Sequence, residues 1–426
     1  MYNIGTMKKP TKHFDVVVVG GGPSGMMAAG RAAERGFSVA ILEKNKDVGD
    51  KLKITGGRRC NITNAEYDNH KFLQNFGDAG KFLFSPFSQH SVSDTFRFFE
   101  KKGLPLVIEG RKRTFPRTQR AYDVYAVMKQ YMKDNKVSII TNSAVLKIVS
   151  ENDNIVNVQT LDCVYSADSF VFATGGTAAP ETGSTGDGFK WLEKIGHTVK
   201  QSSPNVVPLR VNEKWVHELS GTSLSFMKIT FFLNGVKSFS KKGKVLFTHF
   251  GLSGPLILNS SYEVQQLLKA GEVVANIDMF PDTDLGLMEK KMLKIFDANK
   301  NKLLKNVLDL ITPEGMSSAL ESHLTTEELE TKVHSVTVEQ RKYIIAFLKS
   351  MPINIAGTMG FDRAVISDGG IILEEVDMKH MKSRLYKNLF VTGDLLNINR
   401  PSGGFSLQLC WTTGWVAGSS VGKTQE

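Results

Sequence analysis

The sequence has few cysteines and no long apolar run. Its 426 residues contain Cys60, Cys163 and Cys410, and no two of them form a C-x-x-C pair. An odd number of widely separated cysteines argues against a disulfide framework and a redox-active dithiol, and it indicates the reducing cytoplasm. Because no run of about 18 apolar residues occurs, we expect no membrane-spanning helix. Residues 1–13 are basic but contain no apolar stretch, so we predict no secretory signal.

Metal-ligand spacing is also absent, and acidic residues are outnumbered by basic ones. No His/Cys pattern is typical of a metal site, so we expect none. The formal net charge is +10, and the densest basic clusters are residues 111–120 and 237–244. Neither cluster has the aromatic interleaving of an RNA-stacking surface, so nucleic acid is not favoured as a partner.

Residues 14–43 carry the strongest pattern in the chain. An apolar β-branched run, a G-x-G-x-x-G turn, a small-residue helix and a second apolar run follow one another and end at Glu43. This order is a βαβ unit with a dinucleotide fingerprint. Gly20 permits the tight turn, Gly22 lets the backbone approach a diphosphate, and Gly25 lets helix and strand pack closely. The diphosphate would lie at the helix N-terminus, and Glu43 would accept hydrogen bonds from ribose hydroxyls.

Two later segments narrow the cofactor to FAD. The run 388–394 reads as a buried strand that ends at Gly393 and Asp394, where a carboxylate can accept hydrogen bonds from ribityl hydroxyls. The run 400–408 leads through two glycines into a helix, whose N-terminus would face the flavin N1/C2=O edge. A third strand ends in the glycines of ATGG, residues 173–176, which suits close passage of the cofactor. No second fingerprint occurs, so NAD(P)H would bind only transiently.

Three residues, Arg400, His249 and Arg59, are candidates for catalysis, and the first two have a plainer alternative. Arg400 either adds positive charge beside the flavin or forms a surface salt bridge. His249 is either a general base or substrate contact, or an ordinary structural histidine. Arg59 neighbours Cys60, whose thiol pKa the two adjacent arginines would lower; a packed thiol is the favoured alternative for Cys60.

The order of patterns predicts nested domains. A cofactor domain occupies residues 1–202 and is completed by 369–426. Short strand-like runs at regular spacing in 203–282 and 351–368 predict an inserted β-barrel. Residues 283–350 are rich in Lys, Glu and Leu and predict a helical insert. The tail, residues 403–418, is expected to be an amphipathic helix.

The segments 16–29, 49–64, 182–209, 243–255 and 388–418 together resemble one family across nearly the whole chain. It is the YhiN/BaiN-like group of flavoproteins, NAD(P)/FAD-dependent oxidoreductases that include aminoacetone-oxidase-like members. The resemblance implies an α/β fold: a discontinuous Rossmann-like FAD domain of glutathione-reductase type, with inserted β-barrel and helical domains. The chain departs from the family pattern at two places that would shape the substrate pocket. Arg58 replaces a glycine before Arg-Cys-Asn, and Ala178-Ala179-Pro180 replaces a tyrosine and proline.

The fingerprint and the resemblance together define the expected cofactor site. Its residues are Gly20, Gly22, Pro23, Ser24, Gly25, Glu43, Lys44, Lys53, Gly57, Arg59, Cys60, Asn61, Val145, Thr174, Gly175, Gly176, Gly393, Asp394, Gly403, Gly404, Phe405 and Ser406.

The expected function is hydride transfer between flavin N5 and a small organic substrate. Two modes stay open: an amine or aminoketone oxidase that uses O2, and a reductase that uses NAD(P)H and an enone-like acceptor. Two further alternatives are an RNA-associated flavoprotein, supported by the +10 charge, and a flavin-binding protein without turnover.

Overall fold

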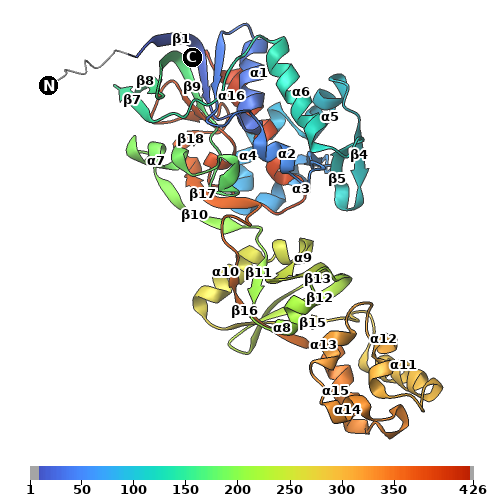
Figure 1. Cartoon of the computed structure of the whole chain (residues 1–426). Coiled ribbons are helices and arrows are strands. Elements are labelled where there is room, and N and C mark those ends of the chain that lie inside the picture. Colours follow the sequence, from blue (N-terminus) through green and yellow to red (C-terminus); the bar gives the residue numbers. More distant parts are fainter. Residues whose placement is uncertain (1–8, 423–426) are drawn as a thin grey trace, which may run out of the picture. The chain divides into compact units, whose positions relative to one another are not determined.

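The computed structural model describes residues 9–422, and these separate into two compact units (Figure 1). The first unit runs to Pro204 and resumes at Val365, and the second is Asn205–Ala364. The first unit is therefore made of both ends of the described chain. The predicted division of the insert into a barrel domain and a helical domain stays a prediction. The predicted absence of a secretory signal concerns residues that lie mostly outside the described part.

The first unit is built on one large sheet. Its strand order is β18-β19-β20-β9-β1-β2-β6, and β20, β9, β1, β2 and β6 run parallel. Val16 of β1 pairs with Val39 of β2 and with Ser169 of β9. A hairpin of β7 and β8 extends β9. The bounds are β1 Thr11–Val19, β2 Val39–Leu42, β6 Ser138–Ile140, β7 Lys147–Glu151, β8 Asn154–Gln159, β9 Val164–Phe172, β18 Val376–Asp377, β19 Lys382–Ser383 and β20 Leu389–Val391.

Two smaller sheets and eight α-helices complete the described part of this unit. One sheet has the order β3-β5-β4 (Thr63–Asn64, Arg113–Pro116 and Leu106–Glu109), and the other pairs β10 (Val199–Asn205) with β17 (Ile366–Ile371). The helices are α1 Pro23–Glu34, α2 Asp50–Ile54, α3 Asn69–Leu73, α4 Gly80–Gln89, α5 Val92–Lys101, α6 Ala121–Asp134, α7 Asp187–Lys194 and α16 Phe405–Ser420.

The C-terminal helix α16 is buried on all sides, so the expectation of an amphipathic helix was wrong. It packs backbone-to-backbone on α1: a Cβ on Gly414 would lie 2.4 Å from the Ser24 carbonyl oxygen, and one on Gly418 would lie 2.5 Å from that of Ala28. Its polar side chains are buried but bonded, as where Gln408 Nε2 donates to Thr95 Oγ1 at 2.9 Å. Hydroxyl and amide groups that look solvent-facing in the sequence therefore lie inside the unit.

His90 is a buried histidine beside this helix, and it predicts a pH-dependent stability. Its ring stacks on Trp415 at 4.9 Å, and burial lowers its pKa from 6.5 to about 4. The unfolded chain therefore binds a proton more readily than the native protein between these two values. We expect the free energy of unfolding to fall by up to about 3 kcal/mol as pH decreases from 6.5 to 4. Urea titrations of the wild type and His90→Gln across this range test it: a difference between them that does not change with pH would contradict the expectation.

The second unit contains a closed barrel of order β11-β14-β13-β12-β15-β16. Its longest strands are β12 (Ser223–Leu233) and β13 (Val236–Thr248). The basic cluster 237–244 lies on β13, where alternate side chains face away from the barrel interior. The other strands are β11 Leu209–Val211, β14 Gly251–Ser253, β15 Val273–Asp278 and β16 Met351–Thr358.

The expected helical segment of the second unit contains five described α-helices, α11 to α15. Their apolar faces, including Met292, Leu320 and Leu348, join the buried cluster of the barrel. The helices of this unit are α8 Lys214–Glu218, α9 Pro255–Leu258, α10 Ser261–Ala270, α11 Leu285–Ala298, α12 Leu308–Ile311, α13 Ser317–Glu321, α14 Thr326–Glu330 and α15 Val338–Lys349.

Candidate cofactor site

The glycine turn after β1 has one position with open space. A Cβ on Gly20, which has a φ of +104°, would lie 2.6 Å from the Ala173 carbonyl oxygen. A Cβ on Gly25 would lie 2.0 Å from the Gly20 carbonyl oxygen. No atom lies within 4 Å of the corresponding position on Gly22, the N-cap of α1. Gly20 and Gly25 are thus required by the protein's own packing, whereas Gly22 leaves room for a ligand at the start of α1.

Glu43 closes this turn from the end of β2. Its Oε2 accepts a hydrogen bond from the Gly21 amide at 2.7 Å, and its Oε1 accepts one from the Asn45 amide at 2.9 Å. The Glu43 carboxylate therefore lies against the glycine turn, where a ribose beside the diphosphate would meet it.

Two other residues of the expected cofactor site are already engaged within the protein. Lys44 donates to Asp187 at 2.9 Å. Val145 is buried, with 8% of its surface exposed.

Segments from the N-terminal and C-terminal parts of the first unit meet beside α1. A Cβ on Gly393, which has a φ of +64°, would lie 2.6 Å from Ser24 Oγ, and the Gly393 amide donates to Thr413 Oγ1 at 3.1 Å. A Cβ on Gly176 would lie 3.6 Å from Asp394 Cβ. The fingerprint, the ATGG segment and the strand β20 therefore converge on one place.

The remaining residues of the ATGG segment adjoin α7 and the loop that precedes it. Thr174 Oγ1 is buried and has no hydrogen-bond partner among residues 9–422, and it lies against Gly188 of α7. Gly175, with a φ of +74°, lies close to Ser184. Pro23 occupies the first turn of α1, where a missing amide hydrogen costs no bond.

Arg400 is buried rather than exposed, so the surface salt-bridge alternative was wrong. Only 2% of its surface is exposed, and its guanidinium forms an ion pair with Asp394. Its Nε donates to Ser406 Oγ at 3.0 Å, and its Nη1 donates to the Ile398 carbonyl oxygen at 2.7 Å. The charge of Asp394 is thus neutralised from within the site.

The glycines before α16 touch the segment that follows the Arg-Arg-Cys-Asn motif. Gly404 has a φ of +103°, and a Cβ there would lie 2.3 Å from the Thr63 carbonyl carbon. Asn64 Nδ2 donates to the Gly403 carbonyl oxygen at 3.2 Å. Phe405, the first residue of α16, packs its ring 4.9 Å from that of Phe72. The N-terminus of α16 is therefore held at this edge by two neighbouring segments.

The loop from Gly56 to Asn61 is held by polar contacts to the three-stranded sheet β3-β5-β4 and its surroundings. Arg59 pairs with Glu109, donates from Nε to Gln119 at 2.7 Å and covers the Phe115 ring at 4.2 Å. Asn61 Oδ1 accepts from the Thr114 amide at 3.2 Å.

Two further members of this loop differ in their surroundings. Gly57 has a φ of +67° and no atom within 4 Å of a Cβ position. Cys60 is fully buried, and burial raises the pKa of its thiol. The alternative of an activated Cys60 thiolate was therefore wrong.

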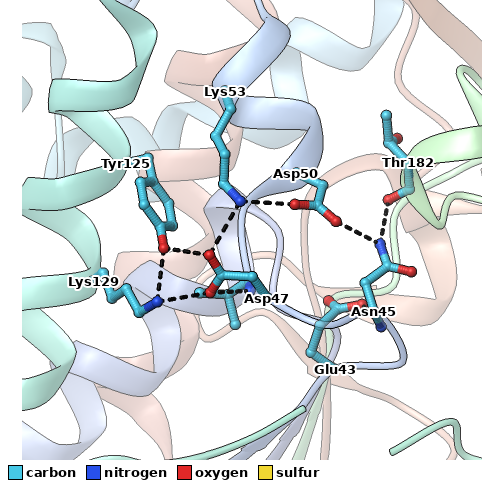
Figure 2. Close-up of polar contacts among 9 residues, drawn as sticks. Glu43, Asn45, Asp47, Asp50, Lys53, Tyr125, Lys129 and Thr182 are labelled. Carbon is cyan, nitrogen blue, oxygen red and sulfur yellow. Dashed lines mark hydrogen bonds and ion pairs between the residues drawn. The ribbon is translucent and has the colours of Figure 1, made fainter. Parts of the chain in front are cut away.

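Lys53 takes part in a polar network that fastens α2 to α6 (Figure 2). Its ammonium donates to Asp47 at 3.1 Å and to Asp50 at 2.8 Å. Asp47 also accepts hydrogen bonds from Tyr125 and Lys129 of α6. Burial alone would raise the pKa of Asp47, but these hydrogen bonds outweigh burial and hold that pKa below its usual range. Lys53 is thus already paired within the protein.

Lys51, on the same helix, is a site residue that the sequence did not single out. Its charge interacts with Asp394, Cys410, Arg400 and Glu181, and burial lowers its pKa. The sequence does not show which of the two lysines is free to bind a ligand, because both lie in one polar segment. Only the hydrogen bonds of Lys53 to Asp47 and Asp50 show that Lys53 is already paired within the protein.

His249 lies in the second unit, between β13 and β14. It is exposed, and its ring packs 4.9 Å from that of Phe250. Its role as a base or substrate contact stays a prediction.

Residues 9–422 contain no group of three or more His, Cys, Asp or Glu side chains arranged to hold a metal ion. No helix in the same range is long and apolar enough to cross a membrane.

The residues around α1 fit an FAD molecule. The open space at Gly22, the helix N-terminus behind it and the carboxylate at the end of β2 match a diphosphate and its ribose. Asp394, in the turn Gly393–Leu395 that follows β20, and the N-terminus of α16 provide the expected contacts for the rest of the cofactor. FAD would supply hydride transfer at flavin N5.

Comparisons with known proteins agree with this geometry. Residues 14–420 match the HI0933-like protein Rossmann domain family. The 3-dehydro-bile acid delta(4,6)-reductase of Clostridium scindens is 27% identical over 95% of this chain and 98% of its own. The ribosomal RNA dihydrouridine synthase of Escherichia coli is 24% identical over 96% of this chain and 98% of its own.

Two solved structures are similar in fold. The 3-ketosteroid-delta4-(5alpha)-dehydrogenase of Rhodococcus jostii RHA1 has a TM-score of 0.55 at 13% identity, covering 98% of this chain and 99% of that one. A flavocytochrome c3 fumarate reductase has a TM-score of 0.53 at 14% identity, and the match covers 97% of this chain and 78% of that one. At these identities the two structures show the fold alone.

Proposed function

The chain belongs to the HI0933-like family and is an FAD-dependent oxidoreductase, and we propose that it reduces a carbon–carbon double bond conjugated to a carbonyl group. The family, the cofactor and the enzyme class were all predicted from the sequence, and the matches confirm them. The alternative of a flavin-binding protein without turnover was therefore wrong.

One observation carries the choice of reaction. The two relatives described above match nearly the whole chain, and both are named for adding hydrogen to a double bond: a delta(4,6)-reductase of a 3-oxo bile acid, and a synthase of dihydrouridine. In a steroid enone and in uridine alike, the double bond is conjugated to a carbonyl group. Such a bond accepts hydride at the carbon farther from the carbonyl, and a proton is added at the nearer carbon. This shared chemistry supports the reductase over the amine oxidase.

The protein's own groups would bind the cofactor and stabilise charge. The amides at the start of α1 and Glu43 would hold the ADP half, and Asp394 the ribityl chain. The N-terminus of α16, at Gly404 and Phe405, would face the pyrimidine edge of the flavin and stabilise the negative charge of its reduced form. NADH or NADPH would deliver the electrons in a transient complex, because the sequence contains no second dinucleotide fingerprint.

Anaerobic stopped-flow spectroscopy of the purified FAD-loaded protein tests the proposal. We expect NADH or NADPH to bleach the flavin band, and a cyclic enone to restore it with formation of the saturated ketone. Aminoacetone is the control electron donor and is expected to leave the oxidised flavin unchanged. Bleaching by aminoacetone, with no reoxidation by any enone, would replace the reductase by the amine oxidase.

A second candidate substrate is a uridine within RNA. Exposed basic side chains come from three nearby segments of the first unit: Arg58, Arg111, Lys112, Arg117 and Arg120. Tyr67 is 52% exposed, packs 5.6 Å from Phe96 and lines with it a hollow of about 640 Å³. The Ala65 amide donates to the Lys112 carbonyl oxygen at 2.6 Å, so the segment that carries Tyr67 adjoins the basic turn. Cations beside an exposed aromatic ring suit phosphates and stacked bases.

The same stopped-flow assay separates the two substrates when a uridine-containing RNA replaces the enone. An RNA substrate predicts binding that weakens with salt, and reoxidation that is slowed in Arg111→Gln/Lys112→Gln/Arg117→Gln. The matched control is Lys237→Gln/Lys242→Gln/Lys244→Gln, which removes as many exposed cations from β13. RNA that neither binds nor reoxidises the flavin would leave the small enone as the substrate class.

The cysteines bear on where the protein works. Cys60, Cys163 and Cys410 are all free and buried. Free thiols persist in a reducing compartment. This supports a cytoplasmic enzyme.

A further inference from the structure

Two lysines of α2 have opposite surroundings. Lys53 is paired with Asp47 and Asp50, as Figure 2 shows. Lys51 has no hydrogen bond or ion pair within residues 9–422. Residues two positions apart on a helix point about 200° away from each other. Because the Asp47 network fixes the direction of Lys53, it also directs Lys51 to the other side of α2.

That other side belongs to the cofactor site. The Gly49 amide, just before α2, donates to the Gly21 carbonyl oxygen at 2.8 Å, so α2 is tied to the glycine turn. The groups whose charges act on Lys51 are Asp394, Arg400 and Glu181, together with Cys410 of α16. Burial raises the pKa of the Cys410 thiol to about 12, so Cys410 carries no charge at neutral pH.

The positive charge of Lys51 is not balanced by the acidic groups around it. Asp394 is neutralised by Arg400, which is itself buried. Glu181 is exposed, so water screens its charge. A Cβ on Gly393 would lie 3.8 Å from Cys410 Sγ and 2.6 Å from Ser24 Oγ, so this group adjoins the second residue of α1. An unpaired ammonium that acts on this group would adjoin the helix N-terminus, which is the place that binds the diphosphate in Rossmann folds.

We propose that Lys51 supplies the positive charge that binds the diphosphate of FAD, and that the Asp47 network is the device that positions it. Lys53 is then a structural residue that holds α2. The proposal concerns cofactor binding alone and does not depend on which substrate the enzyme reduces.

Binding of FAD, ADP, adenosine and riboflavin to the full-length apoprotein tests the proposal, with calorimetry as the readout. Loss of a hydrogen bond to a charged group corresponds to an affinity loss of about 10- to 100-fold. We expect this loss in Lys51→Gln for FAD and ADP, with unchanged affinity for adenosine and riboflavin, which lack the diphosphate. Lys51→Arg should retain most of the affinity. Lys53→Gln, the matched control, should change FAD affinity less than 3-fold, an estimate of about 0.6 kcal/mol, while lowering the melting temperature.

A pH series adds an independent readout. Because burial lowers the pKa of Lys51 in the apoprotein, its ammonium loses its proton at a lower pH than an exposed lysine. FAD affinity of the wild type should therefore weaken as pH rises toward 10.5, the ordinary lysine value, whereas Lys51→Arg should show no such decline. Wild-type FAD affinity in folded Lys51→Gln, or an equal loss for adenosine, would overturn the proposal. A wild-type apoprotein that takes up no FAD would instead overturn the cofactor assignment.

Discussion

Gly22→Ala is expected to weaken FAD binding about 100-fold or more without unfolding the apoprotein. No protein atom lies within 4 Å of a Cβ at this position, and the backbone has a φ of −75° and a ψ of 179°, which alanine adopts readily. The stability of the apoprotein should change by less than about 1 kcal/mol, because the restriction of the unfolded chain by alanine is opposed by alanine's poorer fit to the N-cap position. The methyl group would occupy the space where the backbone must approach the diphosphate. Flavin fluorescence titration and thermal melting of the apoprotein measure the two effects.

Gly25→Ala is the matched control for that experiment. Its methyl group would lie 2.0 Å from the Gly20 carbonyl oxygen, inside the protein's own backbone packing. We therefore expect Gly25→Ala to lower the melting temperature, whether or not FAD is present. If Gly22→Ala binds FAD as tightly as the wild type, the diphosphate does not lie at Gly22, and the proposed site is wrong.

Arg400→Gln is expected to destabilise the apoprotein by about 3 kcal/mol. The variant leaves the Asp394 carboxylate largely buried, with 17% of its side chain exposed, and without its ion-pair partner. Breaking a buried pair costs about 3–5 kcal/mol, and the nearby charge of Lys51 keeps the expected value at the lower end. Urea unfolding of the apoprotein measures the loss.

Two further variants make this measurement specific. Asp394→Asn/Arg400→Gln removes both charges and should recover much of the lost stability, since no uncompensated charge stays buried. Lys242→Gln breaks an ion pair whose side chains are 57% and 82% exposed, and it should change stability by less than about 1 kcal/mol. An effect of Arg400→Gln no larger than that of Lys242→Gln would mean that the buried pair does not stabilise the site.

The elements predicted best are those with strong local signals. The βαβ unit was predicted because buried parallel strands are continuously apolar, and because a G-x-G-x-x-G turn between a strand and a helix has few other interpretations than a dinucleotide site. The strand before Asp394 was predicted for the same reason, although it ends at Val391 and Asp394 lies in the turn that follows it. The C-terminal helix was placed correctly, but its environment was not, because its small and hydroxyl residues pack against α1 and the neighbouring segments. Residue types alone do not show whether a threonine faces water or a buried partner.

Charged residues of the site were the hardest to assign from the sequence. Arg400 was open between two roles, and only its burial beside Asp394 shows that it is an internal group. Cys60 follows two arginines in sequence, yet Arg59 pairs with Glu109, and burial governs the thiol pKa. A side chain's charge state depends on neighbours that are distant in sequence, and local spacing does not contain them.

The sequence by itself determined the family, the α/β class and the FAD cofactor, because the glycine turn and the strand-ending acids are local patterns tied to one kind of ligand. The tertiary structure decided which charged groups in the site are already paired. It commits Lys53 to Asp47 and Asp50, pairs Arg400 with Asp394, and leaves Lys51 without a partner in residues 9–422. The physical reason is that these acids lie only three to six residues from their partners, yet which side chains meet depends on how the folded chain turns between them and on distant groups, such as Lys129, which is 82 residues from Asp47.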